Sequence, residues 1–360
     1  MRSLFRFLLK LILVVLILGI GYALYVFLSY HRIDDNQVLS VVHNDNTEKV
    51  ETGKPYSVLS FNIGFGAYEP DYGFFMDGGT QSWAWSKERL VTNLSNIGYF
   101  LYAADSEDDF FFIQELDAKS TRTYHVDERA YIKDALNNKS SVFAINYDSP
   151  FLMYPVSLKP HGKSLSGIMT LSDFNITSSV RRSLPIEEGL MKYVDLDRCF
   201  TVSRVEVENG RELILINLHL SAYTSDGKIT DQQLEMLLTV MKEEYEKGNY
   251  CIAGGDFNKD VTGMGAEGFG ISGGEYNWAK KIDSALLESY NIRLADMYDE
   301  NNPVPSCRNA DGPYHPNQYQ ITLDGFLVTD NVEIISTEVL DTGFRYSDHN
   351  PVRMTFSLIP

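Results

Sequence analysis

Leu11–Leu28 is an unbroken run of 18 apolar and aromatic residues without a charge, and it limits the possible folds more than any other part of the sequence. A helix rises about 1.5 Å per residue, so this run spans roughly 27 Å, close to the hydrocarbon thickness of a bilayer. A buried helix of a soluble protein normally carries polar residues along one face, and this run has no such face. The sequence therefore predicts one N-terminal transmembrane helix.

The charges that flank this run predict its orientation. Three basic side chains lie within residues 2–10, whereas Asp34 and Asp35 follow the run. Positively charged flanks stay in the cytoplasm, so we expect a cytoplasmic N-terminus and an extracytoplasmic remainder at the cell membrane. A cleaved secretory signal is the alternative. Its apolar core usually has about 7–15 residues and ends in small residues, whereas this run ends in bulky Tyr25 and Phe27.

The rest of the chain divides into a short polar segment and one large domain. Residues 1–28 are expected to form a cytoplasmic tip and the anchor, and residues 29–54 an extracytoplasmic stalk, because they are polar with little periodicity. Residues 55–360 are long enough to bury one large core. The chain has 3 cysteines, which cannot form a disulfide framework.

The chain is strongly acidic. It holds 31 Lys and Arg against 49 Asp and Glu, a net charge of −18. Residues 1–54 hold 6 basic and 5 acidic side chains, so residues 55–360 carry a net charge of −19. Proteins that bind nucleic acid usually present clustered Lys and Arg, so this balance argues against a broad surface for a polyanion. A small basic patch can still occur within a negative total.

The large domain alternates apolar strands with amphipathic helices, which predicts an α/β layered architecture. Helices are expected at residues 85–104 and 231–247. Strands are expected at residues 56–62, 109–114, 141–147, 168–172, 199–208, 212–218, 250–254, 321–329, 332–339 and 352–358.

Polar residues interrupt or end these apolar strands at several points. They are Asn62, Glu115, His219, Asp256, Asn258, Asp324, Asp348 and His349. Each Asp or Asn alone is typical of a turn, and a lone His is more often structural. A glutamate at the end of a buried strand is harder to explain structurally, because an unpaired buried carboxylate is costly. Oxygen donors dominate the set, which suits Mg²⁺ or Mn²⁺, and no zinc, Walker or GxSxG motif is present.

Taken in order, these motifs resemble those of the endonuclease/exonuclease/phosphatase superfamily. The matching motifs are Asn62, Gln114-Glu115, Asn217-Leu218-His219, Gly255-Asp256-Phe257-Asn258, Asp324 and Ser347-Asp348-His349. The family is similar in fold to pancreatic-type deoxyribonuclease and includes AP endonucleases, neutral sphingomyelinases and inositol-polyphosphate phosphatases. The resemblance spans residues 56–360, and GDFN followed by SDH is its most specific part. It implies a four-layer α/β/β/α sandwich and metal-dependent hydrolysis of a phosphate ester.

Cleavage of a phosphate ester needs an activated water, a charge clamp on the phosphate and help for the leaving oxygen. For the metal we expect Glu115 as the first ligand, with Asn62 and Asp348 nearby. Asp256 would orient or deprotonate the attacking water, and Asn258 would donate to a phosphate oxygen.

The two histidines complete the expected chemistry. His349 would act as general base or acid, oriented by Asp324, because a carboxylate fixes the tautomer of an imidazole and raises its basicity. His219 resembles the second histidine of the deoxyribonuclease and sphingomyelinase branches, which stabilises the phosphate or protonates the leaving group. The AP-endonuclease branch lacks that histidine, so its presence argues against a role in DNA repair.

Other segments allow two interpretations each. The aromatic residues in 65–85 and 146–159 form either a substrate- or lipid-facing rim or loop aromatics packed on the domain surface. Arg181, Arg182 and Arg198 either hold a phosphate or face solvent. Tyr223, close after His219, is a further site candidate. For the aromatic residues, packing on the surface is favoured, and for the arginines exposure to solvent is the commoner outcome.

The sequence thus favours a membrane-anchored, metal-dependent phosphodiesterase or phosphatase. Its partners would be a phosphate-ester substrate and the membrane, and the anchor and the acidic charge favour phospholipid head groups. An extracytoplasmic, deoxyribonuclease-like endonuclease is an alternative that the charge disfavours. A non-catalytic binding module on the same fold is the other alternative, and no obligate protein partner is inferred.

Overall fold

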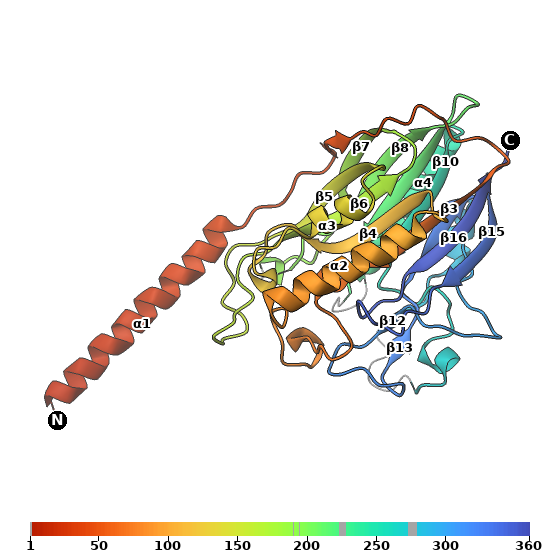
Figure 1. The fold of residues 1–360 in the computed structure, drawn as a ribbon. Coiled ribbons are helices and arrows are strands. Elements are labelled where there is room, and N and C mark those ends of the chain that lie inside the picture. Colours follow the sequence, from red (N-terminus) through yellow and green to blue (C-terminus); the bar gives the residue numbers. More distant parts are fainter. Residues whose placement is uncertain (1, 190, 194, 223–227, 273–278) are drawn as a thin grey trace.

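The computed structural model describes residues 2–189, 191–193, 195–222, 228–272 and 279–360. Within these residues, two seven-stranded sheets pack face to face (Figure 1). In spatial order, the first sheet holds β1 (Gln37–Val38), β7 (Ile176–Ser183), β8 (Cys199–Glu206), β9 (Glu212–His219), β10 (Tyr250–Asp256), β14 (Asp324–Thr329) and β11 (Ile292–Leu294).

The second sheet, also in spatial order, holds β15 (Val332–Val339), β16 (Val352–Leu358), β3 (Pro55–Asn62), β4 (Phe110–Asp117), β6 (Leu165–Ser172), β5 (Ser140–Asp148) and β2 (Val41–Val42). A small two-stranded ribbon, β12 (Cys307–Arg308) and β13 (Gln320–Ile321), lies outside both sheets. The helices are α1 (Arg2–Ser29), α2 (Lys87–Ala104), α3 (Glu128–Ala135), α4 (Lys228–Glu246) and α5 (Ser284–Ser289).

The side-chain alternation of β4 shows how the layers form. Phe110 and Phe112 belong to the main core between the two sheets, whereas Phe111 and Ile113 belong to a second core under α2. Helix α2 begins at Ser86, whose side chain accepts a hydrogen bond from the backbone N–H of Arg89. Helix α4 covers the outer face of the first sheet, and its buried apolar residues form one continuous cluster with those of that sheet and of the main core. The predicted four-layer α/β/β/α sandwich is confirmed.

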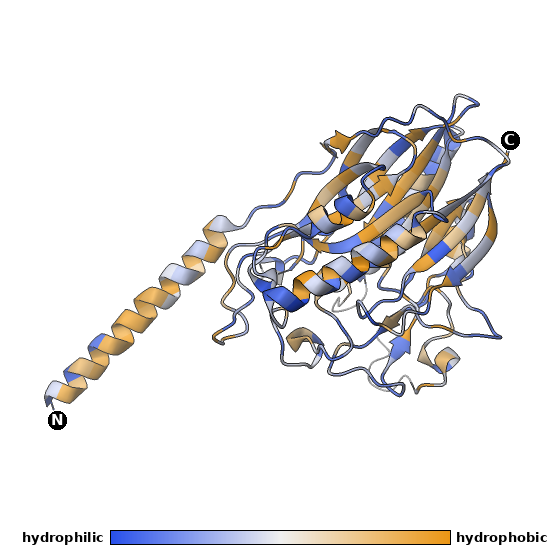
Figure 2. Ribbon diagram, in the orientation of Figure 1, coloured by the Kyte–Doolittle hydropathy of each residue, from blue (hydrophilic) through white to orange (hydrophobic). Residues whose placement is uncertain are grey.

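Helix α1 extends away from the domain and none of its described residues is buried (Figure 1). Figure 2 shows its surface as almost continuously hydrophobic. Among the described residues it is the one helix that is long and apolar enough to cross a membrane. Length and composition thus fit a membrane anchor or a signal sequence.

Residues 29–54 differ from the expected stalk, because much of this segment packs on the domain. Strand β1 pairs with β7 at the edge of the first sheet, and β2 pairs with β5 at the edge of the second. Val50 pairs with Val207 and is fully buried. The segment therefore covers an edge strand of each sheet, which protects the unpaired backbone groups there.

Two expectations for the strands also change. Strand β7 was not predicted, because its alternation is weak and several of its side chains are polar and exposed. The single strand expected at 321–329 is two strands, β13 and β14, separated by Thr322 and Leu323. The first ends in the small ribbon and the second continues into the sheet, where it pairs with β10.

Candidate active site

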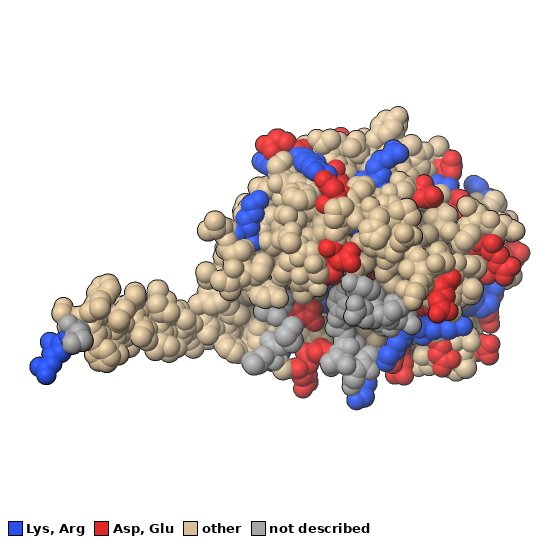
Figure 3. Space-filling view, turned by 90° about the horizontal axis from the view of Figure 1, so that it is seen from below, with Lys and Arg blue, Asp and Glu red and all other residues tan. Residues whose placement is uncertain are grey.

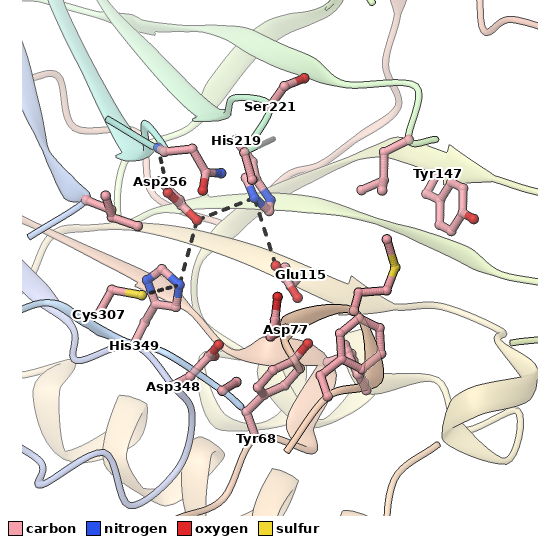
Figure 4. A pocket seen from close by; sticks show the side chains of 18 of the residues that line it. Tyr68, Asp77, Glu115, Tyr147, His219, Ser221, Asp256, Cys307, Asp348 and His349 are labelled. Atoms are coloured by element: carbon pink, nitrogen blue, oxygen red, sulfur yellow. Dashed lines mark hydrogen bonds and ion pairs between the residues drawn. The ribbon is translucent and has the colours of Figure 1, made fainter. Parts of the chain in front are cut away.

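Several predicted site residues meet at one edge of the sheets because of where their strands end. Asn62 ends β3, His219 ends β9 and Asp256 ends β10. In the register of the first sheet, Asp256 lies opposite His219 on one neighbouring strand and Asp324 on the other. This register places the two carboxylates and the imidazole in one cluster, and Figure 4 shows Asp256 beside His219.

Glu115 lies inside β4 rather than at its end. The strand continues to Asp117, and its pairing with β6 shifts register between Ile113 and Leu116. Glu115 has a φ of 56°, a left-handed conformation that is uncommon for a non-glycine residue. An irregularity of this kind redirects a side chain, and here the carboxylate Oε1 comes within 3.9 Å of His219 Nε2.

His349 and Asp324 form a buried hydrogen-bonded pair. His349 Nδ1 is 2.7 Å from Asp324 Oδ2, and the Ser306 hydroxyl donates to the same oxygen at 2.7 Å. Burial alone would lower the pKa of His349, but the charge and hydrogen bond of Asp324, together with Cys307, raise that pKa well above its usual value. The pair leaves His349 Nε2 directed toward the cavity, 3.5 Å from Cys307 Sγ (Figure 4).

Asp256 lies between the two histidines. Its Oδ2 is 3.4 Å from His219 Nε2 and 3.7 Å from His349 Nε2. Burial raises the pKa of Asp256 to about 7, although the positive charge of His349 opposes this shift. Burial, helped by the charge of Arg198, lowers the pKa of His219 well below its usual value. At neutral pH His219 is therefore neutral and His349 is protonated, and the pKa of the Asp256 carboxyl group lies between those of the two histidines.

Asn258 follows Asp256 and is also in place. Its backbone N–H donates to Asp256 Oδ1 at 2.8 Å, and its side-chain amide donates to the backbone oxygen of Leu220 at 2.8 Å. Its φ of 48° is left-handed, which asparagine tolerates better than most residues. The amide has a second N–H, which is the group that the sequence assigned to a phosphate oxygen.

The carboxylates of Glu115, Asp256 and Asp348 line the same cavity, together with those of Asp77, Glu187 and Asp195. Burial raises the pKa of Glu115, and the charge of Asp348 adds to the effect. Burial likewise raises the pKa of Asp348. A divalent cation would relieve this combination of burial and like charge, and carboxylate oxygens are the ligands that Mg²⁺ and Mn²⁺ prefer. The donor set therefore fits a hard divalent metal.

Asn62 takes a different orientation from the one its expected role requires. Its amide nitrogen donates to Glu115 Oε1 at 3.3 Å and to Asp256 Oδ2 at 3.1 Å. Its amide oxygen accepts a hydrogen bond from the backbone N–H of Gly64 at 3.0 Å. In this arrangement Asn62 orients two carboxylates, and its oxygen is engaged by the Gly64 N–H instead of being available to a metal.

A second group of donors overlaps with the first. Ligand atoms of Asp256, Asp324 and His349 lie within 4.8 Å of one another. Two of these residues already bond to each other through Asp324 Oδ2 and His349 Nδ1. We therefore favour Glu115 and its neighbouring carboxylates for the metal, and assign the Asp324–His349 pair to proton transfer.

Arg198 is the site residue for which the sequence left two interpretations open. It is 8% exposed and lines the cavity, and its Nε and Nη1 have no hydrogen-bond partner among the described residues. Two other arginines line the cavity but are already engaged. Arg122 pairs with Asp117 at 3.0 Å, and Arg308 donates to two backbone carbonyls at 3.2 Å. Arg308 Nε also has no partner among the described residues, but Arg198 has two such nitrogens and is therefore the cavity arginine with the most free capacity for an anion.

The other candidates lie elsewhere. Arg181 is fully buried, and its guanidinium donates to backbone oxygens of Ile145 and Asp197. Arg182 pairs with Asp35 at 3.0 Å, away from the cavity. Tyr223 lies outside the described residues. No pattern in the sequence indicated Ser306, Cys307 or Arg308, because Ser306 lies in an irregular segment and the other two form the two-residue strand β12.

The aromatic segment 65–85 combines both interpretations that the sequence allowed. Phe65, Tyr68, Tyr72 and Phe74 are buried together in the second core, so they pack as structural aromatics. All but Tyr72 also line the cavity, whose volume is about 320 Å³. The cavity thus has carboxylates and histidines at its base and an aromatic wall beside them (Figure 4).

Comparisons with known proteins agree with this fold. The model of the Endonuclease/Exonuclease/phosphatase family matches residues 59–349. An endonuclease/exonuclease/phosphatase from Beutenbergia cavernae has a TM-score of 0.56 at 17% identity, covering 85% of this chain and 72% of that one. The human nocturnin catalytic domain with bound sulfate has a TM-score of 0.51 at 16% identity, covering 89% and 97%. A mannosyl-6-phosphatase from Bacteroides thetaiotaomicron also has a TM-score of 0.51 at 16% identity, covering 84% and 100%.

No curated protein sequence matches this chain significantly. The structural identities are low and establish a shared fold alone. The family match, by contrast, extends over most of the chain and includes each of the predicted site residues. The chain therefore belongs to the endonuclease/exonuclease/phosphatase family.

Proposed function

We propose that the protein is a divalent-metal-dependent phosphoric ester hydrolase that acts on phospholipid head groups. Residues 55–360 form its catalytic domain, and α1 anchors it in the cell membrane with the N-terminus in the cytoplasm and the domain outside. The observation that carries the proposal is the arrangement of Asp256 between His219 and His349, with His349 bonded to Asp324.

The chain's own residues support a hydrolytic mechanism. Asp256, with its pKa near 7, accepts a proton from the attacking water at neutral pH. His349 keeps its proton because of Asp324, and its Nε2 donates to the phosphate as negative charge builds up. His219 is neutral and reaches the same space, so it is placed to assist the leaving oxygen.

Glu115 and Asp348 would hold Mg²⁺, with Mn²⁺ as the alternative, and Asn62 would orient the Glu115 carboxylate through its amide N–H. A bound cation supplies positive charge at the phosphate oxygens and lowers the pKa of a bound water. Asn258 and Arg198 add N–H donors on the cavity side, and both have unused hydrogens among the described residues.

The proposed substrate class follows from the anchor and the charge. A domain tethered by α1 stays beside lipid, and residues 55–360 carry a net charge of −19. Figure 3 shows basic side chains interspersed with acidic ones on one face of the molecule. A nucleic acid would be bound more strongly by clustered Lys and Arg, so the endonuclease remains the second choice. The mannosyl-6-phosphatase with this fold supports hydrolysis of a phosphate ester.

The test uses the full chain reconstituted in lipid nanodiscs. We expect hydrolysis of bis-p-nitrophenyl phosphate with Mg²⁺, loss of activity in EDTA, and recovery with added Mg²⁺ or Mn²⁺. His349→Ala and Asp256→Asn should each lose at least about 100-fold in rate. Asp330→Asn is a matched control, because its carboxylate is exposed and, among the described residues, its ion pair is with Arg293.

A substrate panel then separates the alternatives. Phospholipid vesicles should be hydrolysed faster than plasmid DNA or RNA at equal phosphate concentration. Preferential cleavage of DNA would favour the endonuclease. Full activity in His349→Ala would contradict the mechanism, and binding without any turnover would favour a non-catalytic module.

A further inference from the structure

The connection between β5 and β6 carries an unusual number of exposed apolar side chains. We call residues 151–158 the apolar loop. Its exposed side chains, with their exposed fractions, are Phe151 (41%), Met153 (54%), Tyr154 (57%), Val156 (97%) and Leu158 (102%). Soluble surfaces tolerate single exposed apolar residues, but a contiguous group of them marks a contact surface.

The apolar loop contacts the membrane-spanning helix itself. The hydroxyl of Tyr22 donates to the backbone oxygen of Phe151 at 3.3 Å and accepts from the backbone N–H of Met153 at 2.8 Å. The hydroxyl of Tyr25 accepts from the backbone N–H of Phe151 at 3.0 Å. These contacts hold the apolar loop against the last two turns of α1.

The position of these tyrosines sets the depth of the loop. Tyr22 precedes the last residue of α1, Ser29, by seven positions, which corresponds to about 10 Å along the helix. Tyrosines near the end of a transmembrane helix lie at the interface between head groups and hydrocarbon. A loop bonded to Tyr22 and Tyr25 must therefore lie at the same level when α1 spans a bilayer.

The apolar loop is also joined to the rim of the active-site cavity. The ring of Tyr154 lies 5.3 Å from that of Phe75, and its backbone oxygen accepts from the N–H of His161 at 2.7 Å. His161 lines the cavity, as does Met76, which is 58% exposed. The loop thus connects α1 on one side with the cavity rim on the other.

We propose that the apolar loop inserts into the outer leaflet beside α1 and forms a second membrane contact. The contact holds the mouth of the cavity at the level of the lipid head groups, where a phosphate ester of a membrane lipid can enter. Val156 and Leu158 are the deepest-inserting side chains, because they are the most exposed. The proposal rests on α1 spanning the membrane, as proposed above.

The occupant of this surface is lipid rather than a second protein chain. The contacts with Tyr22 and Tyr25 make the loop continuous with a helix whose described residues are all unburied. Any protein that covered the loop would have to compete with the lipid that surrounds α1. Amphipathic residues such as Tyr154 and Met153 suit the interface between an apolar and an aqueous phase.

Depth-dependent quenching tests the proposal on the full chain. Val156→Cys and Leu158→Cys are labelled with an NBD fluorophore, and the protein is reconstituted in phosphatidylcholine–phosphatidylglycerol vesicles that contain nitroxide lipids. The natural cysteines Cys199, Cys251 and Cys307 are all buried, so the label goes to the introduced thiol.

Ile335→Cys is the matched control. Ile335 is an apolar residue in β15 that is 51% exposed, and β15 lies on the side of the domain away from α1 (Figure 1). We expect at least threefold stronger quenching at positions 156 and 158 than at 335. Equal quenching at the three positions, or protection of the loop labels without quenching, would overturn the proposal.

Carbonate extraction distinguishes failure of the anchor from failure of the loop. If the chain stays on the vesicles but the loop labels are not quenched, the proposed insertion of the apolar loop is wrong and the anchor is retained. Release of the chain by carbonate overturns the anchor and, with it, the proposed insertion.

A double variant tests the effect on function. Val156→Asp with Leu158→Asp should lower hydrolysis of vesicle phospholipid at least tenfold and leave that of bis-p-nitrophenyl phosphate unchanged. Unchanged lipid hydrolysis would contradict the proposal. If the unaltered chain hydrolyses neither substrate, the proposed function fails, whereas the quenching experiment still decides the membrane contact.

Discussion

Asp324→Asn is the substitution that isolates one electrostatic interaction in the site. Asparagine keeps the shape of the side chain and removes its negative charge. The lost partner is the imidazole of His349, whose Nδ1 is 2.7 Å from Asp324 Oδ2. Both side chains are buried, so solvent cannot replace the missing charge.

The size of the effect follows from the distance between the charges. The centres of a carboxylate and an imidazolium in such a pair are roughly 4 Å apart, and their attraction is about 4 kcal/mol at an effective dielectric constant near 20. Part of this energy offsets the desolvation of both groups. We therefore expect a net loss of about 3 to 4 kcal/mol in transition-state stabilisation, which corresponds to a fall in kcat of about 100- to 1000-fold.

The pH dependence should change in a defined direction. Asp324 raises the pKa of His349 above its usual value, so the neutral asparagine lowers that pKa. The limb of the pH–rate profile that reports His349 should move to lower pH in Asp324→Asn. Kinetics with bis-p-nitrophenyl phosphate between pH 5 and about 10, at saturating Mg²⁺, measure both kcat and the position of this limb.

Ser306→Ala provides the graded control. Ser306 donates to Asp324 Oδ2 at 2.7 Å and carries no charge, so its loss should lower kcat by about tenfold or less. Circular dichroism and thermal melting establish that each variant is folded. Wild-type kcat in folded Asp324→Asn, or a limb at unchanged pH, would refute the assignment of Asp324 as the partner that sets the protonation of His349.

Three further predictions concern other parts of the molecule. Arg198→Ala should raise KM for a phosphate ester by about 10- to 100-fold, because it removes a charge-assisted donor, whereas Arg182→Ala should leave KM unchanged. Glu244→Gln should lower the free energy of unfolding by about 2 to 3 kcal/mol at pH 7, measured by urea unfolding. Burial opposes ionisation of Glu244, but hydrogen bonds from three partners lower its pKa to about 2. The stabilisation by the ionised carboxylate is therefore lost as the pH falls from 4.5 toward 2. Gly255→Ala should abolish folding at 37 °C, because φ is +145° and the new Cβ would lie 2.0 Å from a backbone oxygen of the neighbouring strand. Gly210 lies in open space at φ +81°, so Gly210→Ala should lower the free energy of unfolding by only about 1 kcal/mol.

The residues that carry the predicted chemistry could be found from the sequence because each contrasts with an apolar strand. Asn62, His219 and Asp256 are the last residues of strands that are buried on both faces, where a polar side chain has few structural uses. Parallel pairing of β3 with β4 and of β9 with β10 brings such strand ends to one edge. The order of the motifs along the chain then indicated the layered sandwich.

The features that escaped prediction lie where tertiary contacts override local pattern. Glu115 was predicted, but the register shift in β4 that brings it into the site was not, because such a shift does not change the alternation of apolar residues in the sequence. The place of Arg198 in the cavity depends on the packing of the loop before β8. Residues 37–50 form strands of only two residues, too short for alternation to show, and they pair with partners more than 90 positions away.

The link between α1 and the domain determines how far the domain can reach from the end of the helix. Residues 30–36 span at most roughly 25 Å when extended, and ion pairs of Arg32 with Asp197 and of Arg182 with Asp35 tie them to the domain. With α1 in a bilayer, the domain is held at a fixed height and tilt above the membrane instead of moving freely on a flexible linker. On the proposed lipid substrate, encounters would then occur by lateral diffusion within one leaflet. The proposal therefore predicts that turnover follows the number of protein and lipid molecules per unit of membrane area and stays constant when the vesicles are diluted in buffer.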